Sequence, residues 1–198
     1  AGICGSDIGA FRGSNPLVSY PRTIGHELAG EVISAPENDA GIKPGDRVIV
    51  DPYLYCGKCY PCSLGRTNCC EQLRVLGVHV DGGMSEYFAH PVSMLLKVPE
   101  DMPWEVIPIA EPLTIALHGL HRARLARGEH IAINGAGTIG LLAAMCALHY
   151  GAVPIVIDPI KARLEKAREL GVSLTIHLGE ENLEQKIREY TSGRMAEV

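Results

Sequence analysis

Four cysteines lie close together in this 198-residue chain, in the pattern Cys56-x2-Cys59-x2-Cys62-x7-Cys70. Three thiols separated by two residues each are too crowded to bridge one another, because a disulfide requires particular Cα and Cβ distances. The same spacing lets a turning backbone direct several sulfurs at one tetrahedral ion. The pattern therefore predicts a structural zinc site. On local spacing alone, Cys69 is as good a candidate for the fourth ligand as Cys70.

A second chemical pattern is a glycine-rich turn at residues 135–140, which reads Gly-Ala-Gly-Thr-Ile-Gly. It follows a predicted strand at 129–134 and opens a predicted helix, which is the context that a dinucleotide-binding turn requires. Gly135 would allow the tight turn, Gly137 would let the backbone approach a pyrophosphate, and Gly140 would let helix and strand pack closely. The phosphates would bind the free N–H groups at the helix N-terminus.

Asp158 ends the next predicted strand, 18 residues after the glycine turn. Its carboxylate is expected to accept hydrogen bonds from the adenosine ribose hydroxyls and to repel a 2′-phosphate, which favours NAD over NADP. Thr138 and Ile139, at the start of the helix, belong to the predicted cofactor site, and Arg163 could flank the adenosine. The alternative is a helix-start turn in an α/β fold that binds no nucleotide, with Arg163 on a solvated helix face.

The elements that must position these residues differ between the two halves of the chain. The first half is broken by Gly and Pro, and its short β-branched runs predict strands at 29–34, 47–51 and 85–89. In the second half, strands and helices alternate, which predicts an α/β fold with a parallel sheet. The predicted helices are 115–127, 138–150, 161–170 and 181–190, and the predicted strands are 129–134, 153–158 and 173–178.

Composition excludes several classes of function. The chain has 46% hydrophobic residues and a formal net charge of -5, which is typical of a folded globular protein and lacks the basic face that nucleic-acid binding needs. The longest apolar run, 139–148, is about half the length of a membrane span. No signal peptide is visible, so we expect a reducing cytoplasmic compartment and no membrane or nucleic-acid partner.

Further motifs occur in the order of one known family. They are Cys4-Gly5-Ser6-Asp7, Gly25-His26-Glu27, the four-cysteine lobe, Asp81-Gly82-Gly83 with Glu86-Tyr87, Ala110-Glu111-Pro112 and the glycine turn. With these motifs the whole chain resembles the zinc-dependent medium-chain alcohol dehydrogenases. Within that family it looks most like the sorbitol and threonine dehydrogenase branch, which acts on polyols and sugar acids. The stretches 19–22, 65–71 and 77–79 look closest to the L-galactonate and L-gulonate 5-dehydrogenases.

The resemblance implies a particular domain organisation. A β-rich, GroES-like zinc-binding catalytic domain would cover residues 1–113, with the structural zinc lobe at 56–70. The first half of a Rossmann doubly wound parallel sheet, which binds NAD, would cover 114–198. Relative to the family, the leading strands of the catalytic domain and the second half of the nucleotide-binding domain are missing. We therefore expect a fragment of a longer enzyme, inactive on its own.

The resemblance also implies a second, catalytic zinc ion. It makes Cys4 and His26 ligands of this ion, Glu27 a ligand or a close carboxylate with a catalytic role, and Glu111 a further ligand. Which of the two glutamates is bound at rest stays open. In the four-cysteine lobe, the family register selects Cys70 as the fourth ligand.

The activity implied by the resemblance is hydride transfer from a secondary alcohol of a polyol or sugar acid to NAD. Ser6 resembles the hydroxyl that carries the alcohol proton away. In many relatives the relay continues to a His five residues after the ligand Cys, but here that residue is Gly9. The resemblance implies a homo-oligomer, a dimer or a tetramer. The alternative is a truncated, inactive zinc- and nucleotide-binding remnant with a scaffold role.

Overall fold

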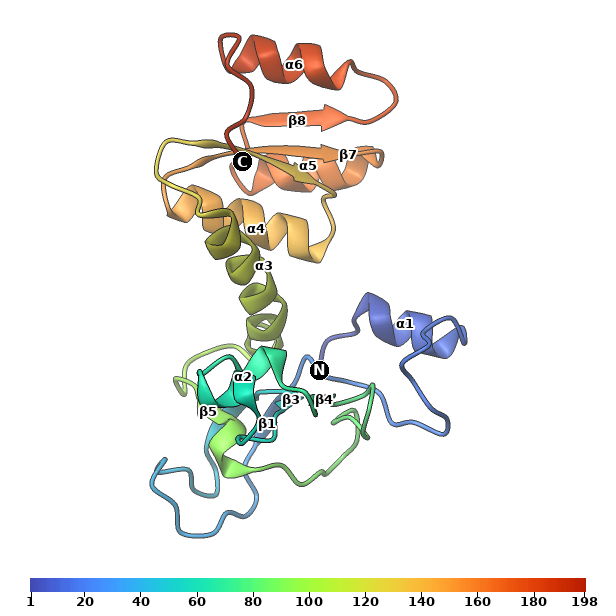
Figure 1. Cartoon of the computed structure of the whole chain (residues 1–198), viewed down its shortest axis with the longest axis vertical. Helices are drawn as coiled ribbons and strands as arrows, with labels where there is room; N and C mark the ends of the chain where they lie inside the picture. The colour runs from blue at the N-terminus through green and yellow to red at the C-terminus, as the bar shows by residue number, and fades with distance from the viewer. The chain divides into compact units, whose positions relative to one another are not determined.

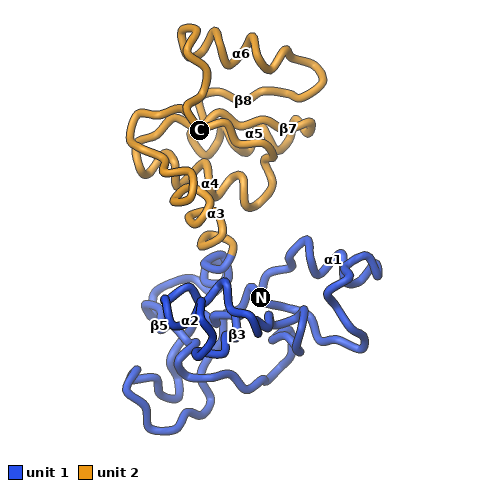
Figure 2. Tube along the Cα trace, in the orientation of Figure 1, with its two compact units in different colours: residues 1–111 blue, residues 112–198 orange.

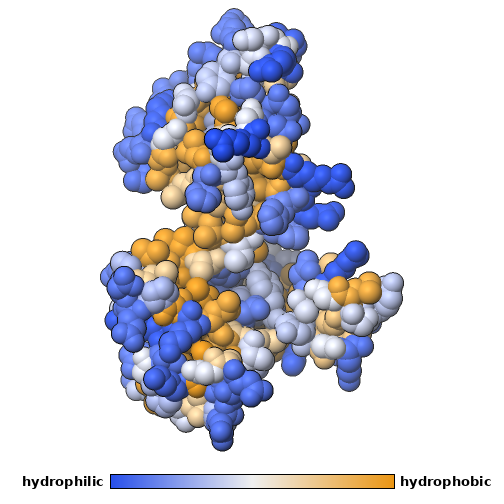
Figure 3. Space-filling model, turned by 90° about the vertical axis from the view of Figure 1, so that its left-hand side faces the viewer, coloured by the Kyte–Doolittle hydropathy of each residue, from blue (hydrophilic) through white to orange (hydrophobic).

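The computed structural model describes residues 1–198 and divides into two compact units. Unit 1 is Ala1–Glu111 and unit 2 is Pro112–Val198, drawn in different colours in Figure 2. None of the helices has the length and apolar character needed to cross a membrane. Figure 3 shows hydrophobic atoms at the surface of both units, and the exposed large apolar side chains include Phe11, Leu17, Ile33 and Tyr87.

Unit 1 consists of short strands and helical turns joined by long loops. Its α-helices are α1 (Gly5–Phe11) and α2 (Tyr60–Ser63), and its 3-10 turns are η1 (Thr67–Cys69), η2 (Val92–Met94) and η3 (Ile107–Ile109). Its strands are β1 (Ala29–Glu31), β2 (Arg47–Val50), β3 (Tyr53–Leu54), β4 (Arg74–Val75) and β5 (Leu95–Lys97).

Two small antiparallel sheets form the framework of unit 1. Strand β2 is central in the order β1-β2-β5, while β3 and β4 pair separately. Alternate residues of β2 are buried, as expected for a strand with one face on the core. Val48 packs with Val32 and Ile42, and Val50 packs with Leu28 and Leu76. These contacts fix the chain on both sides of β1, at Leu28 and Val32, and Leu28 comes directly after residues 26 and 27.

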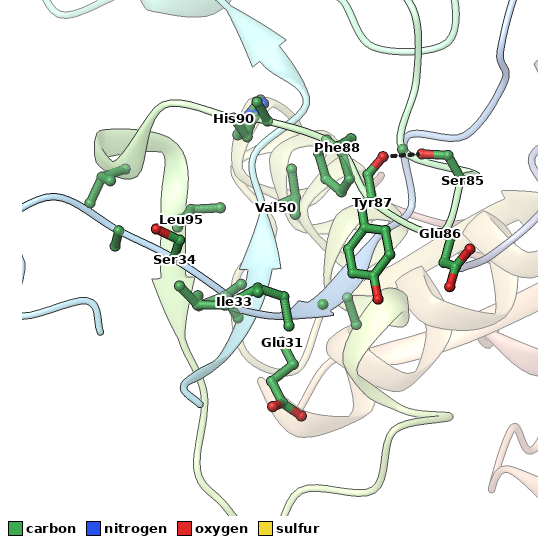
Figure 4. A pocket seen from close by; sticks show the side chains of 18 of the residues that line it. Glu31, Ile33, Ser34, Val50, Ser85, Glu86, Tyr87, Phe88, His90 and Leu95 are labelled. Atoms are coloured by element: carbon green, nitrogen blue, oxygen red, sulfur yellow. Dashed lines mark hydrogen bonds between the residues drawn. The ribbon is translucent and has the colours of Figure 1, made fainter. Parts of the chain in front are cut away.

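The predicted strand at 85–89 is wrong. These residues have no strand assignment and run along one side of a groove of about 700 Å³. Figure 4 shows Ile33 and Ser34 on one side of this groove and Glu86 and Tyr87 on the other. An alternating sequence becomes a strand only when a partner takes its backbone hydrogen bonds. None of the predicted metal ligands lines the groove.

Unit 2 alternates strands with helices, as Figure 1 shows. Its helices are α3 (Ala110–Ala123, which begins at the end of unit 1), α4 (Thr138–His149), α5 (Lys161–Glu169) and α6 (Leu183–Tyr190). Its strands are β6 (His130–Asn134), β7 (Val153–Asp158) and β8 (Leu174–His177), in the order β6-β7-β8 with both pairings parallel. The predicted α/β fold with the start of a doubly wound parallel sheet is confirmed.

Strand β7 is buried on both faces, which explains its continuous apolar sequence. Val156 packs with Ala144 of α4 and Leu164 of α5, while Ile155 packs with Ile187 of α6 on the opposite face. Helices therefore cover both sides of the sheet. The other edge of β6 is paired as well, because the backbone N–H of Ala132 donates to the carbonyl of residue 198 at 2.8 Å.

Two glycines fix the turn between β6 and α4. Gly135 has a φ of 107°, a conformation that side chains disfavour. A Cβ atom on Gly140 would lie 1.8 Å from the carbonyl oxygen of Gly135. The helix can therefore approach the strand only because residue 140 has no side chain. At Gly137 the backbone φ is -77° and a Cβ would meet no atom within 4 Å.

We expect Gly140→Ala to destabilise the protein by about 1–3 kcal/mol, since the added methyl forces the backbone apart. Gly137→Ala is the matched control in the same turn. Its stability should change by less than about 0.5 kcal/mol, because its φ suits alanine and the methyl meets no protein atom. Urea unfolding of both variants measures the difference. Equal destabilisation by the two substitutions would contradict the packing argument.

Candidate functional site

The four cysteines of the predicted structural site meet in one group. The sulfur atoms of Cys56, Cys59, Cys62 and Cys70 all lie within 4.8 Å of one another. The first three come from the loop after β3 and from α2, and the fourth follows η1. All seven cysteines of the chain are free thiols. Four converging sulfurs from a short segment are the donor set of a closed, tetrahedral structural zinc site, so the predicted grouping is confirmed.

Backbone N–H groups point at these sulfurs and favour their ionised form. The N–H of Cys59 donates to the sulfur of Cys56 at 3.4 Å, and the N–H of Gln72 donates to the sulfur of Cys70 at 3.3 Å. The N–H groups of Lys58 and Cys59 lower the pKa of Cys56 to about 6, whereas burial and the neighbouring thiols raise the pKa of Cys62 to about 12. Four such thiols ionise together only beside a cation, so these residues fit a zinc ion.

The structure separates the two candidates for the fourth sulfur ligand. Cys70 is buried and belongs to the group, while Cys69 is exposed and lies outside it. Cys69 is the last residue of the 3-10 turn η1 and Cys70 follows it, so one step along the backbone rotates the side chain away. Local spacing contains no information on this rotation, which is why the cysteine pattern alone left the choice open.

A second group joins residues far apart in the sequence. Cys4, at the start of α1, and His26 and Glu27, which precede β1, place their ligand atoms within 4.8 Å of one another. The N–H of Gly2 donates to the carbonyl of Glu27 at 2.8 Å and holds the two segments together. Thiolate, imidazole and carboxylate are all zinc ligands, and three protein ligands leave a fourth position open.

The segment 81–84 holds the backbone that leads to His26. The N–H of Gly82 donates to the carbonyl of Thr23 at 2.8 Å, and the N–H of Gly83 donates to the carbonyl of Gly25 at 3.1 Å. A Cβ atom on Gly82 would lie 2.3 Å from the carbonyl oxygen of Gly25. The Asp81-Gly82-Gly83 motif thus sets the position of the imidazole by direct contact between backbones.

Asp7 is a site residue for which the sequence gave no specific role. Its Oδ2 accepts the N–H of Cys4 at 2.9 Å and caps α1, and its Oδ1 lies 3.7 Å from Nδ1 of His26. Both side chains are buried, and this Nδ1 has no hydrogen-bond partner. A histidine whose Nδ1 faces a carboxylate directs Nε2 towards a metal. The available signal was position, since Asp7 follows Cys4 by one helical turn.

The remaining residues predicted for this site lie around the group. Ser6 Oγ is 3.5 Å from Nε2 of His26. Glu111 is not one of the three converging residues; its Oε1 accepts a hydrogen bond from the Tyr53 hydroxyl at 2.5 Å. Burial and the nearby charge of Glu111 raise the pKa of Glu27. The two carboxylates therefore influence each other, but only Glu27 joins Cys4 and His26.

The predicted nucleotide site lies within unit 2. Gly137 is the N-cap of α4 and offers no side-chain cap, so the first N–H groups of this helix are available to an anion. Gly135 donates its N–H to the carbonyl of Ile157 at 2.7 Å, which fixes the turn against β7. Thr138 and Ile139 begin α4. The open space beside Gly137 fits a phosphate group.

Asp158 lies at the end of β7, beside the glycine turn, and is almost completely buried. Its oxygens accept the N–H of Ala136 at 2.8 Å and the N–H of Ile160 at 2.7 Å, and Arg163 lies 3.6 Å away. Burial alone would raise the pKa of Asp158, but the two N–H groups and the guanidinium lower it. The carboxylate is thus ionised and also connects the turn to α5, a role that the sequence did not predict.

Comparison with known proteins follows this division of the chain. Residues 1–100 match the alcohol dehydrogenase GroES-like domain, and residues 138–198 match the zinc-binding dehydrogenase domain. The whole chain is 59% identical to an uncharacterized zinc-type alcohol dehydrogenase-like protein of Haemophilus influenzae and covers 58% of it. Over 83% of the chain, identity to L-galactonate-5-dehydrogenase of Escherichia coli is 46%, covering 48% of that protein. The chain is 33% identical to sorbitol dehydrogenase of Bacillus subtilis and covers 57% of it.

Two solved structures resemble the chain closely. An Escherichia coli alcohol dehydrogenase (rspB) complexed with the cofactor NADH has a TM-score of 0.88 and 40% identity, over 96% of this chain and 56% of that one. Galactitol-1-phosphate dehydrogenase from Escherichia coli has a TM-score of 0.90 and 34% identity, over 98% of this chain and 56% of that one. The chain thus spans between about half and three fifths of the length of these relatives.

We expect Cys70→Ser to bind one zinc equivalent fewer and to lower the melting temperature by about 10 °C or more, because structural zinc contributes to folding free energy. Cys69→Ser is the matched control one residue away and should change neither quantity. Elemental analysis and thermal unfolding of the two variants provide the measurements. Loss of zinc from Cys69→Ser would show that the assignment of the fourth ligand is wrong.

Proposed function

Because this chain belongs to the zinc-type medium-chain alcohol dehydrogenase family, we propose that the protein oxidises a secondary alcohol of a polyol or sugar acid with NAD. L-galactonate-5-dehydrogenase and sorbitol dehydrogenase, at 46% and 33% identity, support this substrate class. The relative crystallised with NADH supports the cofactor. A four-thiolate zinc site is typical of a reducing compartment, which supports the cytoplasm.

The observation that carries this proposal is the convergence of Cys4, His26 and Glu27 within 4.8 Å. The closed four-sulfur group has no position left for a substrate, whereas a three-residue group with mixed donors has one. The buried, unpartnered Nδ1 of His26 beside Asp7 indicates an imidazole oriented for a ligand on its other nitrogen. These residues fit a catalytic zinc ion, with Cys4, His26 and Glu27 as the groups that would hold it.

A zinc ion in this group would supply Lewis-acid polarisation of an alcohol oxygen. The surrounding side chains would then manage the proton. Ser6 places its hydroxyl 3.5 Å from the imidazole and is the residue that would accept the alcohol proton at Oγ. Gly9, where many relatives have a histidine, has no side chain to continue the relay. We propose that the proton leaves Ser6 through water.

The residues of unit 2 would bind and orient the dinucleotide. The N–H groups of Thr138 and Ile139 would contact the pyrophosphate at the open face beside Gly137. The ionised Asp158 would accept hydrogen bonds from the adenosine ribose through its remaining lone pairs, with Arg163 alongside.

The test is a screen of polyols and sugar acids with the purified full-length enzyme, since this chain covers only 58% of its relative, and it follows the reduction of NAD by absorbance. We expect turnover of at least one polyol or sugar acid and much weaker activity on simple primary alcohols.

A moderate chelator should abolish this activity with little change in thermal unfolding, because the open site exchanges its ion before the closed one. Fresh protein that contains two zinc ions but oxidises none of these substrates would contradict the proposal.

Cofactor preference should depend on Asp158. We expect Asp158→Ser to lower the ratio of kcat/KM with NAD to kcat/KM with NADP by roughly 10–100-fold. The substitution removes the charge-assisted hydrogen bonds to the ribose hydroxyls and the repulsion of a 2′-phosphate. The ratio is the informative measurement. Asp158→Ser also removes the hydrogen bonds that the carboxylate accepts from Ala136 and Ile160, and this loss would weaken the binding of NAD and NADP equally. Lys166→Ala, on the exposed face of α5 where Lys166 pairs with Glu169, is the control and should leave the ratio unchanged. A native protein that already prefers NADP would exclude this role.

A further inference from the structure

Tyr53, at the start of β3, makes a close contact with a residue 58 positions later in the chain. Its hydroxyl donates a hydrogen bond to Oε1 of Glu111 at 2.5 Å. This separation is typical of an O–H group donating to an ionised carboxylate. Glu111 is buried and Tyr53 is partly buried, so water competes little for the bond. No sequence motif pointed to Tyr53.

This pair adjoins the Cys4–His26–Glu27 group. The negative charge of Cys4 acts on the Tyr53 hydroxyl, and this hydroxyl is the donor of the bond because an ionised carboxylate only accepts. The charge of Glu111 likewise acts on Glu27. The carboxylate of Glu111 is directed to Tyr53, whereas the carboxylate of Glu27 lies with the thiol and the imidazole.

We propose that Tyr53 is a positioning residue that determines which carboxylate binds the metal ion. Its hydroxyl keeps Glu111 hydrogen-bonded outside the group, so that Glu27 is the third ligand beside Cys4 and His26. This inference rests on the proposed function, since it assumes a metal ion in that group. The physical reason is orientation. The short hydrogen bond from Tyr53 fixes the side chain of Glu111 outside the Cys4–His26–Glu27 group, so Glu111 must turn before it binds an ion there.

The selection has a consequence for the open position of the site. Two ionised carboxylates beside one ion would fill the position that the substrate oxygen needs. The Tyr53 hydroxyl compensates part of the charge of Glu111 without placing it on the ion. Exchange between the two glutamates then requires the Tyr53–Glu111 hydrogen bond to break. Tyr53 therefore controls the exchange through Glu111, without itself touching the ion.

The experiment uses Co²⁺ as a spectroscopic probe in the purified protein. A chelator empties the open site, and Co²⁺ refills it while zinc stays in the four-sulfur site. In Tyr53→Phe we expect Glu111 to bind the ion, which weakens the visible cobalt absorption as a ligand is added and slows release of the ion about tenfold. Tyr87→Phe is the matched control, because Tyr87 is exposed and contacts none of these residues.

The same substitution in a Glu111→Gln background distinguishes a positioning role of Tyr53 from a role in packing alone. In Glu111→Gln protein, Tyr53→Phe should leave both the cobalt spectrum and the release rate unchanged, because the residue through which it acts no longer has a carboxylate. An identical spectrum for Tyr53→Phe and unmodified protein would overturn the proposal, as would an equal effect in the Glu111→Gln background. If unmodified protein bound no Co²⁺ outside the four-sulfur site, the proposed catalytic metal would fail first.

Discussion

At Gly82 the backbone lies so close to the preceding segment that a Cβ atom would be 2.5 Å from the carbonyl oxygen of Ile24 and 2.3 Å from that of Gly25. The residues that follow Gly25 are His26 and Glu27, so this contact fixes where both side chains begin. A further glycine has the same role nearby, since a Cβ on Gly2 would collide with the carboxylate of Glu27. Close backbone contacts at these two glycines therefore bring Cys4 to the histidine and the glutamate.

Charge compensation then decides what each group of side chains can hold. In the four-sulfur group, N–H groups such as those of Cys59 and Gln72 stabilise thiolates from within the same loop. In the Cys4–His26–Glu27 group, the compensating groups come from other elements: Asp7 faces the histidine and Tyr53 binds Glu111. Buried charges remain ionised only with such partners. The surrounding residues are thus as specific to the chemistry as the donors themselves.

The features that could be predicted from the sequence are those whose residues lie close together along the chain. The cysteine lobe and the glycine turn are local, and β7 was predicted with its observed bounds, because continuous burial leaves an unbroken apolar run. The strand at 85–89 was wrong because alternation does not reveal whether a partner strand is present. The pairing of Tyr53 with Glu111 spans 58 residues and depends on tertiary packing. The family resemblance, not the spacing, brought together Cys4 and His26.

The same difference in sequence range explains how two groups of potential metal ligands with different properties can coexist in one unit. All four sulfurs of the closed group come from 15 consecutive residues, 56–70, so an ion can organise this loop by itself and contribute directly to folding. Cys4 and His26 are 22 residues apart, and backbone hydrogen bonds from Gly2 and from the segment 81–84 hold their two segments in place. The fold of unit 1 therefore preorganises the Cys4–His26–Glu27 group. For the proposed function this means that an ion in the Cys4–His26–Glu27 group would not be needed for stability, and that its ligands would be free to exchange when a substrate binds.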